Sequence, residues 1–591
     1  MTLPPNGLTD AFYSRFTDQY HMEHTTYIGG EEGDAALGVA EWNGAVVVTG
    51  QTESPEGIEF TGPPNGFVDD DWGSGNSGAA QGTCWLARFE PDGDRDWMTL
   101  FGPKFALQPA NVDVDDNGNI YVGGTVHWYL PIWGQPPVEF TDQPTGNSMP
   151  ICGSGFSQST MGFADEEGLP AFWSDGFLAK FTVGLELERS TFFSGSSYID
   201  EITDMEVDRE SGSAFFVGRT FSPLGTNADC EGTAAPEDPG FPWCPGSWSD
   251  PYYVPGMPPD VLHMGMESGF LGIVKNTGEL LYCSSIGTPD EISGVAAVTV
   301  SNGRITLVGN TANEDYVTGC EEPPIGYFPQ CNPQGGNSFT FPFYPNSNEE
   351  YWFIMQFDAT TLELIWSSSL GNVEPKDVSA DDLGNVYVTG EPRTLTWSQT
   401  PLMDHPDYYS SSLPGTGEST VVLGFNSSGQ FWGTFHGNHA ERFAVASRVN
   451  ERIYIAGTRG DEGFVPYNCP WGVVDPWCVD NAAVSGLCYS QLHATLPVGL
   501  DERPTRPNGA LTCFPNPART TLTLVVCSSF DGPGSLTVTD QTGRETVRQR
   551  VNLASSMVTL DLKHFAPGSY TARIVQEVGP LSGTGSFIVL P

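Results

Sequence analysis

The chain contains one run of side chains whose types and spacing could bind calcium. Asp113, Asp115 and Asn117, followed by Gly118, match the first half of a calcium-binding loop. The ligand expected at the twelfth position falls on Gly124, so the full EF-hand pattern is missing. The same stretch also fits a hairpin turn, where Asp, Asn and Gly supply the required backbone angles. These residues can therefore be interpreted either as a hairpin turn or as a calcium site.

A second group of carboxylates lies in a loop-like stretch. Asp69, Asp70 and Asp71 are consecutive, and a loop gives three carboxylates the freedom to converge on a cation. Calcium prefers oxygen ligands, so it is the cation that both groups would suit. We expect no required cofactor, with calcium as the one ion that the sequence suggests.

No sequence motif for catalysis is present. The chain has no GxSxG elbow, no HExxH and no lysine after a glycine as in a phosphate-binding loop. Two histidine pairs lie near expected strand ends, where a spacing of three places side chains on opposite faces: His21 with His24, and His436 with His439. Carboxylates are plentiful, but sequence does not reveal whether two of them face each other as glycoside hydrolysis needs. We therefore expect a protein that is not an enzyme.

The 12 cysteines form an even set without a CxxC knuckle. Zinc sites usually show such knuckles, so disulfides that close local loops in an oxidising compartment fit better. The connectivity is not fixed by the sequence. The candidates are cysteines close together in the chain: Cys230 with Cys244, Cys320 with Cys331, Cys469 with Cys478, and Cys513 with Cys527.

These residues are distributed over a repeat that occupies most of the chain. An apolar strand with an inner glycine recurs at 47–52, 121–125, 216–220, 307–311, 387–390 and 454–458. An aromatic strand follows at 85–89, 177–181, 270–274, 352–357 and 421–425, and 12–16 and 487–492 are similar. Each unit reads as four short strands. Six such units predict an all-β fold, a six-bladed β-propeller whose ring closes by mixing strands from both chain ends in one blade.

The repeat resembles a bacterial β-propeller family called SBBP. Residues 112–122 and 378–388 match the middle of its consensus, with an aspartate, a Gly-Asn turn and a following Tyr-Val strand. The resemblance extends over about residues 10–497. It implies the propeller fold and leaves the function open, because one fold hosts many functions.

Long insertions separate the glycine strand from the aromatic strand in each unit, and we expect them to project from one propeller face. They span 53–82, 126–175, 221–267, 312–350, 391–418 and 459–485. Their aromatic side chains could stack on sugars or anchor a partner, but small cores under long loops are the favoured interpretation. These side chains are Trp128, Trp133, Trp173, Trp243, Trp248, Tyr252, Tyr253, Tyr327, Tyr344, Trp471 and Trp477.

The C-terminal segment has the alternating apolar pattern of a small β-sandwich. Its turn motifs resemble the C-terminal sorting domain, or Por secretion tail, of type IX secretion cargo: Pro515, Asn516 and Pro517; Asp540, Gly543 and Arg544; Pro567, Gly568 and Tyr570. The resemblance implies export by the type IX machinery of a Bacteroidota-like bacterium. The expected location is extracellular or on the outer cell surface.

These assignments divide the chain into a propeller at 1–497, a linker at 498–510 and a sorting domain at 511–591. The N-terminus shows no secretory signal, so the resemblance to export cargo implies that a leader has been removed. No apolar run is long enough for a transmembrane segment.

The net charge of -49 excludes whole classes of partner. Nucleic acids and anionic membranes need clustered Lys and Arg, which this chain lacks. We expect a secreted or surface protein that acts in adhesion or as a structural component of an extracellular assembly, by self-assembly or by binding surface polysaccharide. A carbohydrate-binding or carbohydrate-active propeller is the alternative.

Overall fold

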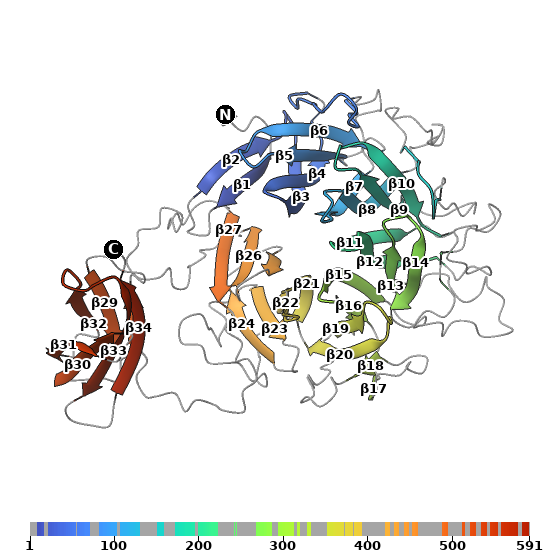
Figure 1. The fold of residues 1–591 in the computed structure, drawn as a ribbon. Helices are drawn as coiled ribbons and strands as arrows, with labels where there is room; N and C mark the ends of the chain where they lie inside the picture. Colours follow the sequence, from blue (N-terminus) through green and yellow to red (C-terminus); the bar gives the residue numbers. More distant parts are fainter. Residues whose placement is uncertain are drawn as a thin grey trace. The chain divides into compact units, whose positions relative to one another are not determined.

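The computed structural model is all-β in the residues that it describes, and it contains two compact units, 1–496 and 497–591 (Figure 1). None of the described elements is an apolar helix of membrane-spanning length. The described residues are 9–16, 22–54, 56–70, 82–102, 107–129, 150–158, 172–195, 199–222, 241–242, 244, 267–286, 293–311, 316–318, 328–331, 351–371, 373–381, 383–392, 420–425, 431–436, 443–447, 452–458, 487–493, 511–514, 521–526, 533–540, 544–552, 557–576 and 582–589.

Six antiparallel sheets, here called blades 1 to 6, follow one another along the first unit, and the second strand of each contains one of the expected glycine strands. This confirms the propeller architecture, while the number of blades around the axis stays a prediction. Blade 1 is β3 (Asp34–Trp42), β4 (Ala45–Thr52), β5 (Thr83–Phe89) and β6 (Arg95–Phe101). Blade 2 is β7 (Leu107–Val114), β8 (Ile120–Tyr129), β9 (Phe172–Phe181) and β10 (Leu187–Phe193). Blade 3 is β11 (Asp200–Asp208), β12 (Ser213–Thr220), β13 (Ser268–Val274) and β14 (Leu280–Ile286).

The remaining blades repeat this order. Blade 4 is β15 (Ser293–Ser301), β16 (Arg304–Thr311), β19 (Tyr351–Asp358) and β20 (Leu364–Gly371). Blade 5 is β21 (Val373–Ala380), β22 (Val386–Pro392), β23 (Thr420–Phe425) and β24 (Phe431–His436). Blade 6 has three described strands, β25 (Phe443–Ser447), β26 (Arg452–Thr458) and β27 (Leu487–His493).

Consecutive blades pack face to face, which explains the continuous apolar runs of the middle strands. The first strand of each blade contacts the first strand of the next, from β3 through β7, β11, β15 and β21 to β25. Between blades 1 and 2, Val47 and Leu86 share a core with Val122 and Phe177. A strand covered on both faces has no solvent side, so its sequence does not alternate.

The glycine of the repeat is required by a close approach within each blade. A β-bulge interrupts the first strand of blades 1 to 5, and the glycine on the second strand faces it. A Cβ at this glycine would lie 1.8–2.6 Å from a first-strand carbonyl oxygen. Such a contact is impossible for a real side chain, so the position admits only glycine. The five glycines are Gly50, Gly124, Gly218, Gly309 and Gly390.

The N-terminal strands β1 (Ala11–Phe16) and β2 (Met22–Ile28) form their own two-stranded sheet, which packs against blade 1. Tyr13 stacks on Phe89 with ring centroids 4.9 Å apart. The expectation that strands from both chain ends mix in one blade is wrong for the described residues. The reason is that β27 fills the place beside β26 that the aromatic strand takes in the other blades, and among the described strands β1 pairs only with β2.

The described parts of four insertions lie along the outermost strand of their own blade. In this position the insertions cover sheet edges that would otherwise be open to pairing. That all insertions project from one propeller face stays a prediction. The contacts join Thr61 to Met98 on β6, Cys152 to Ser190 and Gln158 to Phe192 on β10, Cys244 to Cys283 on β14, and Cys331 to Ser367 on β20. In blade 4 the insertion also forms a parallel pair, β17 (Tyr316–Thr318) with β18 (Phe328–Gln330).

The second unit is the expected β-sandwich. One sheet orders β28 (Leu511–Phe514), β29 (Thr521–Val526) and β32 (Met557–Asp561). The other orders β31 (Glu545–Asn552), β30 (Pro533–Asp540), β33 (Gly568–Gln576) and β34 (Ser582–Val589). Alternate residues from both sheets fill the core, including Leu522, Leu524, Leu536, Val538 and Leu560.

The first prediction concerns the repeat glycine. We expect Gly218→Ala to lower the free energy of unfolding by about 3 kcal/mol, because the new Cβ would press on the Glu201 carbonyl oxygen. The matched control is Gly184→Ala, where the nearest atom lies 3.5 Å away and the change should stay within about 0.5 kcal/mol. Denaturant unfolding followed by tryptophan fluorescence measures both. Equal effects would contradict the steric argument.

Candidate functional site

The aspartate of the repeat motif organises the hairpin turn between the first two strands. Asp115 Oδ1 accepts hydrogen bonds from the amides of Asn117 and Asn119, both at 2.9 Å. Its Oδ2 accepts from Asn119 Nδ2 at 2.8 Å and from the Tyr121 hydroxyl at 3.1 Å. Both carboxylate oxygens are therefore occupied by protein donors, and Gly118 holds the turn with φ +81°.

Blade 5 repeats this arrangement with the same atoms. Asp381 accepts from the amides of Leu383 and Asn385 at 3.0 and 2.8 Å. It also accepts from Asn385 Nδ2 at 2.8 Å and from the Tyr387 hydroxyl at 3.1 Å. The D-x-x-G-N-x-Y pattern is thus a self-contained turn, in which one buried carboxylate satisfies two amides, one side-chain amide and one phenol.

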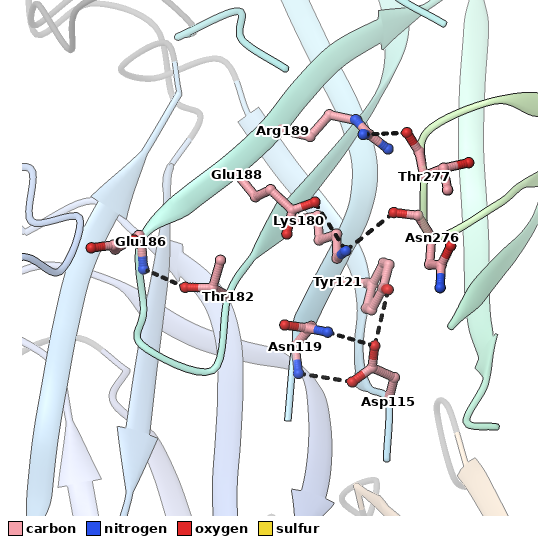
Figure 2. A network of polar contacts seen from close by, with 10 residues as sticks. All are labelled: Asp115, Asn119, Tyr121, Lys180, Thr182, Glu186, Glu188, Arg189, Asn276 and Thr277. Atoms are coloured by element: carbon pink, nitrogen blue, oxygen red, sulfur yellow. Dashed lines mark hydrogen bonds and ion pairs between the residues drawn. The ribbon is translucent and has the colours of Figure 1, made fainter. Parts of the chain in front are cut away.

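The turn in blade 2 also belongs to a polar network that reaches blade 3 (Figure 2). Lys180 Nζ lies 5.5 Å from the centre of the Tyr121 ring and donates to Glu188 and to the Asn276 carbonyl, both at 3.1 Å. Arg189 donates to the Thr277 carbonyl in the same turn of blade 3. Burial, assisted by the negative charge of Asp115, raises the pKa of Tyr121 well above its usual value. Tyr121 therefore stays a neutral donor.

Figure 2 shows these side chains meeting in the space between blades 2 and 3, with the Asp115 turn below and the Asn276–Thr277 turn at the side. Two of the few cations in this acidic chain are used here to hold neighbouring blades together. The arrangement binds backbone carbonyls, so it is a structural contact between repeats.

The predicted calcium residues are placed as follows. Asp113 accepts from the Val114 amide at 2.8 Å and from the Val207 amide of blade 3 at 2.9 Å. Asn117 and Asp70 are exposed, Asp69 is buried beside β6, and Asp71 lies outside the described residues. Within the described ranges, no three His, Cys, Asp or Glu side chains gather in a way that could hold a metal ion. Calcium at these residues stays a prediction.

Most of the other residues singled out in the sequence lie outside the described part. His24 packs against Tyr13 with ring centroids 5.8 Å apart, and His436 ends β24. Trp128 and Trp173 are opposite each other in the β8–β9 ladder. Nothing is described for the side chains of these two tryptophans, for His21 and His439, or for the remaining insertion aromatics.

A second set of polar residues, which sequence reasoning missed, connects the innermost strands. Asn111 Nδ2 donates to Asp204 Oδ1 at 3.0 Å and to the Met205 carbonyl at 3.1 Å. Asp204 Oδ2 accepts from the Val298 amide of blade 4 at 2.9 Å. Burial raises the pKa of Asp204 to about 6. The signal in the sequence is positional, because Asn111 and Asp204 both follow the bulge of their strand.

A third set of polar residues surrounds the aspartate at the start of the first strand in blades 1 and 3, Asp34 and Asp200. Asp200 Oδ2 accepts from the Gly195 amide at 2.7 Å and from the Ser222 hydroxyl at 2.8 Å, while Oδ1 accepts from the Thr220 hydroxyl. Asp34 Oδ2 accepts from the Gly30 amide and the Ser54 hydroxyl, both at 2.8 Å. Burial is the main cause that raises the pKa of both carboxyls, in Asp200 to about 7.

The cysteines divide into two kinds among the described residues. Cys244 and Cys331 are each in a disulfide, and the cysteines expected to pair with them, Cys230 and Cys320, lie outside the described residues. Cys283 is a buried free thiol, and burial raises its pKa. Such a thiol is unreactive. The side chains of Cys469, Cys478, Cys513 and Cys527 are not described, so these disulfides stay predictions.

The sorting motif forms two turns of the sandwich. The Arg544 amide donates to Asp540 Oδ1 at 3.0 Å, and the Asp540 amide donates back to the Arg544 carbonyl at 3.0 Å. The Tyr570 hydroxyl donates to the Ala566 carbonyl at 2.7 Å, which closes the turn through Pro567 and Gly568. Pro515, Asn516, Pro517 and Gly543 lie outside the described residues.

The second prediction tests the repeat turn. We expect Asp115→Ala to lower the free energy of unfolding by about 3 kcal/mol, because two amides, a side-chain amide and a phenol lose their shared acceptor. Asp116→Ala is the matched control, since the neighbouring carboxylate is exposed and the change should be within about 0.5 kcal/mol. Denaturant unfolding compares the two variants. A loss that is no larger for Asp115 than for Asp116 would refute the assigned role.

The third prediction concerns pH. The folded-state pKa of Asp200 lies near 7, above the ordinary value of 3.8, so the folded protein holds this proton more tightly than the unfolded chain. The stability from Asp200 is fully present below about pH 4 and is lost as the pH rises through about 7. We expect Asp200→Asn to reduce the fall in melting temperature between pH 5 and pH 8, and Asp116→Asn to leave it unchanged. Calorimetry at both pH values decides, and an undiminished fall in Asp200→Asn counts against the assignment.

Two family models match parts of the chain. Residues 512–588 match the secretion system C-terminal sorting domain, and residues 96–125 match a beta-propeller repeat. The second match includes the Asp115 turn and Gly124. No curated protein matches the sequence.

Several solved structures are similar in fold at low sequence identity. A gluconolactonase from Xanthomonas campestris is 10% identical, covers 71% of this chain and 82% of its own, and has a TM-score of 0.28. PorZ, a surface component of the type IX secretion system of Porphyromonas gingivalis, is 11% identical with 96% and 83% covered and a TM-score of 0.19. The Dos1 propeller is 9% identical with 75% and 91% covered and a TM-score of 0.25.

The sorting-domain match implies export by the type IX secretion machinery to the cell surface or the extracellular space. The four-stranded sheets of the first unit and the match to a beta-propeller repeat both indicate that this unit is a propeller. This chain is all-β in its described residues, contains a beta-propeller repeat of the SBBP type at 96–125 and carries a type IX secretion system C-terminal sorting domain at 512–588.

Proposed function

We propose that this secreted protein is a non-catalytic component of the cell surface or extracellular matrix, acting in adhesion or as a building block of an assembly. Its propeller serves as a rigid scaffold, and its insertions carry the contacts to partners. The partners are further copies of the chain or surface polysaccharide. Rigid scaffolds that present variable loops are a common arrangement for binding.

The observation that carries this proposal is how the buried polar groups are used. The carboxylates of Asp113, Asp115, Asp200, Asp204 and Asp381 accept hydrogen bonds from backbone amides, hydroxyls and side-chain amides of their own turns or of neighbouring strands and blades. A catalytic carboxylate needs an oxygen directed at its substrate. These five instead stabilise the scaffold, which supports a structural role.

Charge and edge protection support the same role. A net charge of -49 keeps copies of the chain apart in solution, and divalent cations can bridge such surfaces to one another or to acidic polysaccharide. The outermost strands of blades 1 to 4 are covered by insertions, which prevents uncontrolled edge pairing. Association would then proceed through the insertions.

The fourth prediction separates export from function. Deleting residues 511–591 should retain the propeller in the periplasm, because the sorting domain is the element that the machinery recognises. Immunoblots of periplasm, cell surface and medium measure this. Unchanged secretion of the truncated chain would contradict the export assignment without bearing on adhesion.

Adhesion is tested with the full chain. A strain lacking the protein should lose attachment or matrix cohesion in a flow cell, and purified full-length protein should bind to cells of that strain. A polysaccharide hydrolase panel and a glycan array address the alternative. Turnover of any polysaccharide refutes the non-catalytic role, and binding to neither cells nor matrix refutes adhesion and assembly alike.

A further inference from the structure

The N-terminal sheet of β1 and β2 occupies the position of a blade that has only its two outer strands. Arg15 Nη1 donates at 3.1 Å to the Pro91 carbonyl, in the turn between the third and fourth strands of blade 1. The third strands of blades 1 and 2 make the same contact with the next blade, at 3.3 and 3.1 Å: Arg88 with Val183, and Lys180 with Asn276. β1 is therefore equivalent to a third strand and β2 to a fourth strand, and no described strand pairs with the other edge of β1.

Side chains that face the missing inner strands are exposed. Val39 on β3 is 64% exposed. The equivalent residues of blades 2 to 5 are at most 4% exposed and pack on the preceding blade: Val112, Met205, Val298 and Val378. Phe12 on β1 is 39% exposed, whereas its equivalents opposite the repeat glycine are at most 1% exposed: Trp85, Phe177, Phe270, Phe353 and Val421. We call this place, between the free edge of β1 and Val39, the open inner position.

The open inner position has the chemistry of a site for an apolar β-hairpin. A free strand edge and exposed apolar side chains favour pairing with a further strand, and a sheet of only two strands is marginally stable. In the other blades this place is taken by the inner hairpin, which consists of the first two strands of the blade. The last inner hairpin of the chain is β25–β26, which packs on blade 5 through β25 and β21. It is therefore the hairpin that comes next to the open inner position in the order of the ring.

Two strands of the chain fit the same edge of β26. In the described arrangement β27 takes this edge, with Cys488 opposite Gly457 and Ser490 opposite Ile455. The repeat glycine faces the first residue of 488–492 in β27, as it faces Trp85 in blade 1. Residues 12–16 of β1 align with 488–492 in this register, and both segments have Tyr-Ser at their second and third positions. Strand β1 would thus place Phe12 opposite Gly457.

We propose that β1 and β27 exchange on this edge of β26, so that the propeller has two arrangements. In the described arrangement β27 completes the pairing of β26, and the open inner position beside β1 is unfilled. In the other arrangement β25–β26 enters the open inner position, β1 and β2 become the outer strands of blade 6, and β27 is released. The second arrangement covers Val39 and Phe12 and gives β1 a partner on each edge.

The exchange also changes the chain that leads to the sorting domain. Residues 487–493 form β27 and are followed by the segment that leads to the second unit. When β27 is released, these residues lengthen the connection by up to about 23 Å. The exchange concerns the ring itself, so it does not depend on what the insertions bind.

The fifth prediction uses cysteine pairs to trap each arrangement in the full-length protein. Ser14→Cys with Ile455→Cys reports the arrangement with β1 on β26, and Ser490→Cys with Ile455→Cys reports the described one. Residues opposite each other on antiparallel strands are close enough for a disulfide. We expect both links after mild oxidation, measured by mass spectrometry of peptides. In a mixture of normal and heavy-nitrogen protein, each linked peptide should carry a single label, because the exchange occurs within one chain.

Two comparisons make the result specific. Ser14→Cys with Leu307→Cys is the matched control, since Leu307 is at the equivalent place in blade 4 and should give no link. Adding Tyr489→Pro and Ser490→Pro to the Ser14–Ile455 pair should raise the rate of its link at least about tenfold, because proline prevents β27 from pairing. A Ser14–Ile455 link no more frequent than in the Leu307 control, an unchanged rate with the two prolines, or links that carry mixed labels would each overturn the proposal.

Discussion

The close approach of the second strand of each blade to the bulged first strand is the constraint on which the rest of this structure depends. A carbonyl oxygen of the first strand occupies the place where a side chain of the second strand would start, so the second strand carries glycine there in blades 1 to 5. The bulge in turn directs Asn111 and Asp204 toward the neighbouring blade. One local irregularity therefore fixes a sequence position within a blade and creates the hydrogen bonds between blades.

Buried carboxylates take the role that salt bridges play in less acidic proteins. With 73 acidic and 24 basic residues, most acidic side chains cannot pair with a lysine or arginine. The chain satisfies many of them with amides and hydroxyls, as Asp115 and Asp381 show with the same set of donors. The consequence is a set of buried acids with raised pKa values, Asp200 and Asp204 among them, whose effect on stability changes with pH in the neutral range.

The insertions provide a large variable surface and also protect the edges of the propeller blades. A propeller blade ends in an outermost strand whose free edge invites association. In blades 1 to 4 a segment of the insertion returns to this strand and adds backbone hydrogen bonds, such as those from Cys244 to Cys283 and from Ser367 to Cys331. The same chain segments can then vary in length without exposing the edge. A scaffold with protected edges and variable loops suits a secreted protein that presents its loops to partners.

The sequence by itself determined the periodic features, because they arise from local rules. The repeat of glycine strand, turn and aromatic strand predicted the blades, and alternation together with turn motifs predicted the C-terminal sandwich. The sequence of the Asp115 motif fits both a turn and an ion site, and the hydrogen bonds of Asp115 show how the turn is built. Tertiary structure alone decided which strands pair at the chain ends, where the insertions return, and that Asn111 meets Asp204 between blades 2 and 3. These contacts join residues that are distant in the chain or follow no period, so no local pattern in the sequence encodes them.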